Sequence, residues 1–280
     1  MHTMKTMKVW KIAASLCAVA VVLVVTVGVM LGTYSLCVHV CYTRRNHTVT
    51  GLDRHIPNVF HNREQQVVLL QMLQRTTDAL SAFGVTHWMM AGNLLGFERH
   101  GGLIPWDDDI DIAIPGEELE ALITHSNVLE REFHLKLATR RHGLYKLYSV
   151  DEHGVADRDT FIDLFTFSVG KHNHYHQDDA KFIGEFPEQD IFPLRRVTMQ
   201  GVKTFAPKES TFYLNKNFGK SWPDELFVRP PHSNSGFCTL VGDLIRRVNK
   251  KSVVYPNTPE IAREIRQVVH DVALAYKSTL

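Results

Sequence analysis

The sequence predicts an α/β fold of the α+β kind, because helix-like and strand-like stretches follow one another along residues 61–280. Apolar residues recur at helical spacing from Asn62 to Phe83 and again from Pro259 to Lys277. Two apolar, β-prone runs, Asp109–Ile114 and Thr160–Val169, predict strands between these helices. About 220 residues are ample for one sizeable core, so we expect a single globular domain there.

The remaining elements follow from local signals. Gly84 is a plausible stop for the first helix. Pro115 and Gly116 are expected to end the strand Asp109–Ile114. Acidic residues lie in the first turn of the helix expected after this strand, where the helix dipole favours negative charge. In chain order, these signals predict a strand at Val85–Met90, helices at Leu94–Arg99 and Glu117–Leu129, and strands at Phe133–Ala138 and Leu144–Val150.

The run from Asp107 to Asp111 carries four carboxylates in five residues. Strand alternation places Asp109 and Asp111 on one face and the intervening isoleucines on the other. Two like charges held this close repel each other unless a positive group lies between them, and a divalent cation with oxygen ligands fits. The alternative is a solvated acidic loop, although the run is wedged between Ile104–Trp106 and an apolar strand.

A third acid, Asp163, lies in the middle of the apolar run Phe161–Phe167. An aspartate within a central strand is costly unless it is paired or bound to a metal. The alternative is that Asp163 faces solvent on an edge strand or caps a turn. Together, Asp109, Asp111 and Asp163 predict a metal site built from two strands.

The acidic strand also carries a family resemblance. Gly92–Gly96, Arg99–Gly102 and Ile104–Asp111 resemble the signature of the LicD family, which includes bacterial phosphocholine transferases and the animal fukutin and fukutin-related proteins. Weaker similarity at Phe161–Asp163 and Phe212–Trp222 extends the resemblance over roughly residues 90–222. It departs from the family at Asn93, where serine is frequent, and at Phe218, where tyrosine is usual. The resemblance implies a nucleotidyltransferase-like mixed sheet flanked by helices.

The resemblance also implies roles for particular residues. Asp109 and Asp111 are expected to hold Mg²⁺ or Mn²⁺ against a donor pyrophosphate, and Asp163 to complete the metal site or to accept the proton of the attacking hydroxyl. Gly92, Asn93 and Gly96 are expected to offer hydrogen-bond donors to phosphates.

Four further residues are candidates for substrate binding. Arg99 either binds a phosphate or pairs with an acid of Asp107–Asp109, and His100 beside it is predicted to be mainly structural. Asp108 either orients the metal ligands or caps the turn. Lys146 is a phosphate candidate whose alternative is a solvated strand face.

The expected reaction is transfer of a phosphorylated alcohol, such as ribitol phosphate or phosphocholine, from a CDP-activated donor to a glycan or glycolipid hydroxyl, with release of CMP. Two alternatives remain. One is a Golgi glycosyltransferase that uses its acidic pair on a nucleotide sugar, and the other is an inactive, membrane-anchored scaffold with the same fold.

The N-terminal region predicts a membrane anchor. Ile12–Val40 contains no Lys, Arg, Asp or Glu over 29 residues, whereas about 20 apolar residues cross a bilayer. We expect a cytosolic tail at 1–11, a transmembrane signal anchor at 12–34 and a stem at 35–60. This arrangement predicts a type II protein of the Golgi or endoplasmic reticulum with a lumenal catalytic domain, and a buried core helix is the alternative. The spacing of Gly28 and Gly32 allows a homodimer through this helix.

The sequence also bears on two other kinds of partner, nucleic acid and zinc. The formal net charge is +1, from 31 basic and 30 acidic residues, and the sequence has no dense basic stripe, so we expect no nucleic-acid partner. The segment that carries His172, His174 and His176 is expected to be a polar loop. If this segment is extended, the three imidazoles share one face, and a zinc site is the minor hypothesis.

Overall fold

The structure is a computed structural model that describes residues 63–141, 143–178, 184–228 and 253–280. These residues belong to one compact unit, formed by His47–Asn234 together with Asn249–Leu280. The predicted tail, membrane anchor and stem lie outside the described residues. Within the described ranges, we find no helix of sufficient length and apolar character to span a membrane.

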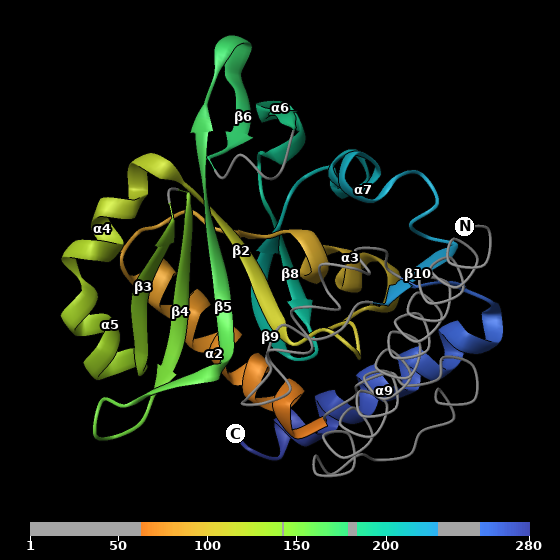
Figure 1. Cartoon of the computed structure of the whole chain (residues 1–280), viewed down its shortest axis with the longest axis horizontal. Helices are drawn as coiled ribbons and strands as arrows, with labels where there is room; N and C mark the ends of the chain where they lie inside the picture. The colour runs from red at the N-terminus through yellow and green to blue at the C-terminus, as the bar shows by residue number, and fades with distance from the viewer. Residues whose placement is uncertain (1–62, 142, 179–183, 229–252) are drawn as a thin grey trace, which may run out of the picture. The chain divides into compact units, whose positions relative to one another are not determined.

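The centre of this unit is a mixed β-sheet (Figure 1). Its main strands lie in the order β1 (Trp88–Met89), β2 (Asp109–Pro115), β5 (Ala156–Val169), β4 (Leu144–Val150) and β3 (Leu135–Arg141). β2 and β5 run parallel, whereas the other neighbours in this series pair antiparallel. The predicted mixed α/β architecture with a central sheet is therefore confirmed.

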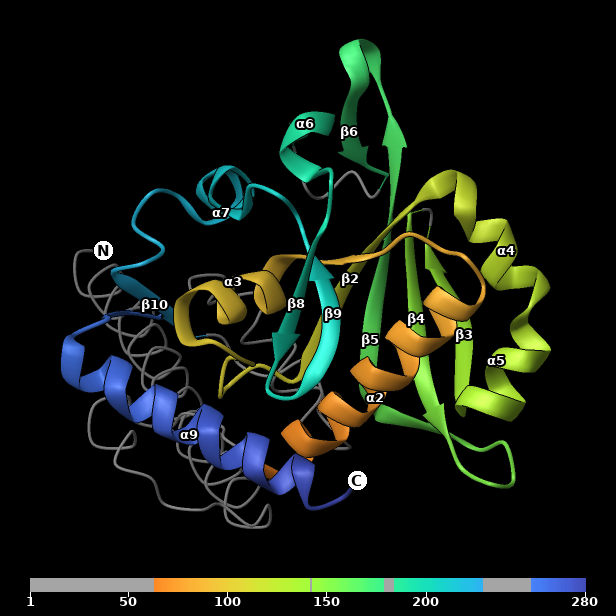
Figure 2. The ribbon, with the colours of Figure 1, turned by 180° about the vertical axis from the view of Figure 1, so that it is seen from behind.

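Helices cover the sheet and its edges. α2 (Arg63–Ala82) crosses one face, where it contacts β5, β2 and β3, and α9 (Pro259–Lys277) packs against α2 (Figure 2). α4 (Leu119–Thr124) follows the 3₁₀ turn η2 (Gly116–Glu118), and α5 (Ser126–Phe133) packs beside β3. α3 (Ala91–His100) follows β1 directly and contacts β2.

The later elements surround this centre. β6 (His174–Gln177), which follows the turn η3 (Lys171–Asn173), pairs with β5 and with β7 (Glu185–Pro187). The hairpin β8 (Arg195–Met199) and β9 (Val202–Ala206) contacts β1 and α2 through β9. The remaining elements are α6 (Glu188–Ile191), α7 (Ser210–Phe218) and the antiparallel pair β10 (Glu225–Val228) and β11 (Val253–Pro256).

The two long helices and the acidic strand match their predictions closely. Gly84, with φ 71°, ends the α2 region in the left-handed conformation that glycine tolerates. Thr258 caps α9 by accepting a hydrogen bond from the Ile261 amide at 3.3 Å, and Pro259 occupies the first turn. On β2, Ile110, Ile112 and Ile114 are all fully buried, as strand alternation predicted.

Two local predictions were wrong, and a third segment differs from the arrangement that its minor hypothesis needs. The helix expected over Glu117–Leu129 is broken at His125, whose ring bonds the Ala121 carbonyl oxygen at 2.7 Å and stacks on Phe83. The strand expected over Val85–Met90 shrinks to two residues, because the Val85 amide donates back to α2. The three histidines do not form one extended run, since His172 lies in η3 with φ 57°.

Leu73 provides a test of the core, because this residue of α2 is fully buried in the hydrophobic core. Leu73→Ala is expected to lower the free energy of unfolding by about 2–5 kcal/mol, from lost burial and the cavity left behind. Urea unfolding measures this change, and Ser81→Ala on the exposed side of the same helix is the matched control. Equal effects of the two substitutions would contradict the assigned packing.

Candidate metal and phosphate site

The sheet brings the three predicted acids together. In the parallel pairing of β2 with β5, Asp111 lies directly opposite Asp163. Asp109 precedes Asp111 by two residues on the same strand face. One carboxylate oxygen from each of these three residues lies within 4.8 Å of the others, which is a spacing suited to a shared cation. The edge-strand alternative for Asp163 was wrong, since β5 is an interior strand of the sheet.

The loop before β2 adds to this concentration of negative charge. Asp107, Asp108 and Asp109 form a second group whose oxygens also lie within 4.8 Å of one another, so Asp109 belongs to both groups. Asp108 and Asp109 are each only 5% exposed. Burial raises the pKa of Asp109 well above its ordinary value, and the charges of Asp111, Asp107, Asp163 and Asp108 raise it further. The solvated-loop alternative is therefore wrong for these acids.

The glycine-containing turn is docked on the acidic strand. The Gly92 amide donates to Asp111 Oδ2 at 3.1 Å, and the Asn93 side-chain oxygen accepts from the Asp111 amide at 2.8 Å. A Cβ atom at position 92 would collide with the Asp107 carboxylate, so a side chain there would require Asp107 to move. Asn93 is 2% exposed, and its Nδ2 has no hydrogen-bond partner among the described residues.

Gly96 occupies a different setting within α3. A Cβ atom on Gly96 would meet the Gly102 carbonyl oxygen, and it would come within 3.1 Å of Ile104. The absence of a side chain therefore lets α3 pack closely on the loop that leads to the acids. A phosphate contact from Gly96 stays a prediction.

Lys146 lies at the acidic site. It faces Asp163 across the antiparallel pairing of β4 with β5, and its Nζ lies 2.6 Å from Asp163 Oδ1. The same ammonium lies 3.1 Å from the centroid of the Phe161 ring. With 9% exposure, Lys146 does not occupy a solvated strand face, so that alternative was wrong.

Arg99 and His100 connect α3 to a later segment. Arg99 Nη1 donates to the carbonyl oxygens of Trp222 and Glu225 at 3.1 and 2.7 Å, and its Nε donates to His100 Nε2 at 3.0 Å. Burial lowers the pKa of Arg99 to about 10. Burial, followed by the charges of Arg99 and Arg266, lowers the pKa of His100 well below its ordinary value. The contact of Arg99 with residues 222–225 was not predicted, and its phosphate role stays a prediction.

Trp106 is a packing residue. It is 5% exposed, and its Nε1 donates to the Phe227 carbonyl oxygen at 3.0 Å.

Tyr213 lies beside the site and was not among the site residues predicted from the sequence. Its hydroxyl accepts a hydrogen bond from the Ala91 amide at 3.2 Å, directly before Gly92. Ala91 has φ 42°, an uncommon conformation for a residue other than glycine, so this bond steadies a strained turn. Burial raises the pKa of Tyr213, and the charge of Asp111 also raises it. The only signal was its place in the Phe212–Leu214 portion of the resemblance.

The central mixed sheet, the acids on β2 and β5 and the glycine turn docked against them together define a nucleotidyltransferase-type domain. The comparison with family models agrees: residues 84–209 match the family described as LicD/FKTN/FKRP, nucleotidyltransferase domain. Residues 84–209 are thus similar to the LicD family, and the resemblance predicted from the sequence is confirmed.

Three curated relatives show the range of this family. An uncharacterized protein of Rickettsia typhi is 24% identical over 186 residues, covering 66% of this chain and 56% of that protein. Human ribitol 5-phosphate transferase FKRP is 29% identical over 181 residues, covering 58% and 32%. The Haemophilus influenzae lipopolysaccharide cholinephosphotransferase LicD is 36% identical over 61 residues, covering 22% and 23%. The chain thus spans from about a quarter to about half the length of these relatives.

The raised pKa of Asp109 predicts a pH dependence for the metal-free protein. An acid with a higher pKa in the folded chain binds protons more tightly there, so stability falls as pH rises from the unfolded value of about 3.9 toward the folded value. Asp109→Asn removes this unfavourable charge. The variant is expected to be more stable than the wild type at neutral pH, with a difference that shrinks as pH falls toward about 4.

Urea unfolding with a metal chelator at several pH values measures this difference. Asp224→Asn, a substitution of an exposed aspartate, serves as the control. A lower stability of Asp109→Asn at neutral pH would contradict the proposed electrostatic strain.

Proposed function

We propose that this chain is a metal-dependent phosphotransferase that moves a phosphorylated alcohol from a CDP-activated donor to a hydroxyl of a glycan or glycolipid, releasing CMP. The observation that carries the proposal is the convergence of Asp109, Asp111 and Asp163 at one point of the sheet. The names of the relatives, a ribitol 5-phosphate transferase and a cholinephosphotransferase, support transfer of a phosphorylated alcohol.

The residues present fit a Mg²⁺ or Mn²⁺ ion. All the candidate ligand atoms are carboxylate oxygens, which are the ligands that these cations prefer. The like charges around Asp109 also favour a cation in their midst. Asp109, Asp111 and Asp163 would hold the ion, and bound there it would neutralise charge on the donor phosphates and on the leaving CMP.

The chain's own groups would then position the donor. The Gly92 amide donates to Asp111 and is therefore already used. The buried Asn93 side-chain nitrogen, Nδ2, would donate to a phosphate oxygen of the donor. Lys146 Nζ, which lies 2.6 Å from Asp163 Oδ1, would place a second positive charge beside the acids. Holding donor and acceptor in line, with charge neutralised, is most of what phosphoryl transfer requires.

We also propose that residues 12–34 anchor the chain as a type II protein of the Golgi or endoplasmic reticulum with the domain in the lumen. The charge-free run Ile12–Val40 supports this proposal. A homodimer through Gly28 and Gly32 is part of the same proposal.

The reaction is tested by incubating the purified full-length chain with CDP-ribitol, CDP-choline, CDP-glycerol and UDP-sugars in parallel, with Mn²⁺ or Mg²⁺. Metal-dependent CMP release from one CDP donor is expected. Asp111→Asn should lower it more than tenfold, because losing metal-borne stabilisation costs several kcal/mol. Asp224→Asn, which alters an exposed aspartate, should leave CMP release unchanged.

Two other results would redirect the assignment. Metal-dependent release of UDP would identify a glycosyltransferase. Absence of turnover with every donor, together with absence of metal binding, would favour a scaffold.

A further inference from the structure

The hydroxyl of Tyr213 connects α7 to the turn that precedes the acidic strand, and the proposed reaction gives this contact no role yet. Tyr213 is 6% exposed, so its hydroxyl needs a partner within the protein. That partner is the Ala91 amide, which donates to the hydroxyl oxygen at 3.2 Å across a separation of 122 residues. The contact forms only when α7 is docked beside the turn, so it couples the two segments.

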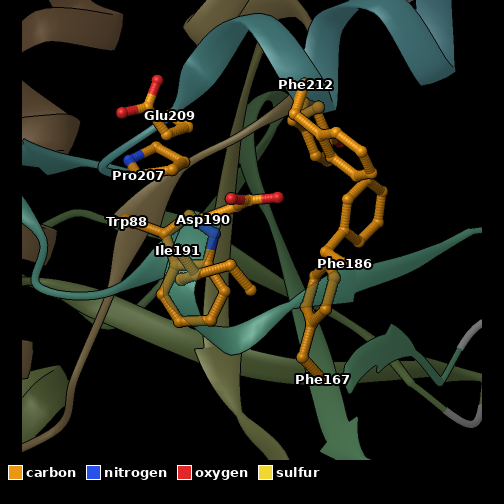
Figure 3. Close-up of a pocket in the computed structure, with 9 residues that line it drawn as sticks. Trp88, Phe167, Phe186, Asp190, Ile191, Pro207, Glu209 and Phe212 are labelled. Atoms are coloured by element: carbon orange, nitrogen blue, oxygen red, sulfur yellow. The ribbon is translucent and has the colours of Figure 1, made fainter. Parts of the chain in front are cut away.

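The ring of Tyr213 is fixed by a series of aromatic contacts that ends on the central sheet. Its centroid lies 4.9 Å from that of Phe186 of β7, at an interplanar angle of 36°. Phe186 lies 6.3 Å from Phe167 of β5, and Phe167 lies 5.5 Å from Trp88 of β1. Figure 3 shows Phe186 between Phe167 and Phe212. Because β1 and β5 belong to the sheet that carries the acids, the aromatic contacts hold the hydroxyl in a defined position relative to the acids.

The backbone of Ala91 is the strained point of this connection. Its φ of 42° is a conformation that a residue other than glycine holds only where surrounding contacts impose it. The Tyr213 hydroxyl is one such contact, since it fixes the direction of the Ala91 N–H group. Without this bond the turn can relax toward a less strained conformation, and the Gly92 amide that follows would move with it.

The Gly92 amide is a hydrogen-bond donor to a candidate metal ligand. It donates to Asp111 Oδ2 at 3.1 Å, which restrains rotation of that carboxylate. Asp111 lies opposite Asp163 in the strand pairing, and both contribute an oxygen to the group of acids whose ligand atoms lie within 4.8 Å of one another. Hydrogen bonds that orient metal ligands typically matter about 10–100-fold in metal affinity. A chain of contacts therefore leads from the Tyr213 hydroxyl through the turn to the candidate metal site.

The hydroxyl of Tyr213 keeps its proton at neutral pH. Burial raises its pKa, the hydrogen bond from the Ala91 amide lowers it, and the charge of Asp111 raises it, with a net rise. A tyrosine titrates only near pH 10 even without such a rise, so Tyr213 is not a base for the reaction. A neutral hydroxyl accepts from the amide without adding a negative charge beside the acids.

We propose that Tyr213 is a positioning residue of the candidate metal site. Its hydroxyl holds the turn at Ala91 and Gly92, and through that turn the Asp111 carboxylate, in the orientation that binds a divalent cation. Tyr213 would act through the turn and not by contact with the cation. The inference rests on the proposed function, because it needs an ion at the three acids. A role confined to the packing of α7 is the competing explanation.

The test is a Mn²⁺ titration of the purified full-length chain without any nucleotide donor. Tyr213→Phe removes the hydroxyl and retains the ring. Its dissociation constant for Mn²⁺ is expected to rise about tenfold, the lower end of what loss of a ligand-orienting bond causes. Tyr276→Phe is the matched control, because it removes the hydroxyl of another buried tyrosine, on α9 beside Gly201. This control should leave Mn²⁺ affinity unchanged.

A second substitution tests the route through the turn. Ala91→Gly introduces the residue that adopts positive φ without steric cost. In the Tyr213→Phe background, Ala91→Gly is expected to restore Mn²⁺ affinity to within about threefold of the wild type, because the turn then depends less on the hydroxyl. A loss of affinity that came from poorer packing of α7 would not be repaired by this change. Circular dichroism of each variant verifies that it is folded under the titration conditions.

The failure of this inference is distinguishable from the failure of the proposed function. Unchanged Mn²⁺ affinity in Tyr213→Phe, or a loss that Ala91→Gly does not repair, would overturn the inference while the metal site stands. Absence of Mn²⁺ binding by the wild type would overturn the metal site and the inference together. Neither readout requires a nucleotide donor, so the donor is tested separately by CMP release.

Discussion

The electrostatic repulsion among the acids at the start of β2 and the middle of β5 is the constraint that shapes the rest of the site. Asp109 and Asp111 share a strand face, and the parallel pairing brings Asp163 directly opposite Asp111. Buried like charges are tolerated only where neighbouring groups or a cation offset them. The surroundings supply part of this offset through the Gly92 amide and the Lys146 ammonium, whereas the Asn93 side-chain oxygen accepts from the Asp111 amide and holds the turn on the strand.

The fold keeps these groups in place through contacts made far from the acidic strand in sequence. Arg99 on α3 binds the backbone of residues 222–225, and Trp106 binds the Phe227 carbonyl oxygen. Tyr213 on α7 holds the Ala91 amide. These partners follow residue 209, where the family match ends. The support of the site therefore extends beyond the matched region, to α7 and to residues 222–227.

The sequence was sufficient to predict the acidic strand, because its alternation of aspartate and isoleucine is local. It also identified Asp163, since an acid within an apolar run is unusual. The Lys146 pairing with Asp163 depends on the cross-strand register of β4 with β5, which local pattern does not determine. Likewise, Gly92 and Asn93 were expected at phosphates, but their contacts with Asp111 arise from the docking of a turn on a strand. The short strands β6 to β11 escaped prediction because their signals are brief and their pairing is tertiary.

The central claim is that the acids of β2 and β5 form one divalent-cation site, and binding of Mn²⁺ to the donor-free protein tests it most directly. Titration of the full-length chain, followed by electron paramagnetic resonance of free Mn²⁺, is expected to show a bound ion that Asp111→Asn and Asp163→Asn each release. Mg²⁺ should compete for the same site. Undiminished Mn²⁺ binding in both variants, or no binding by the wild type, would contradict the account.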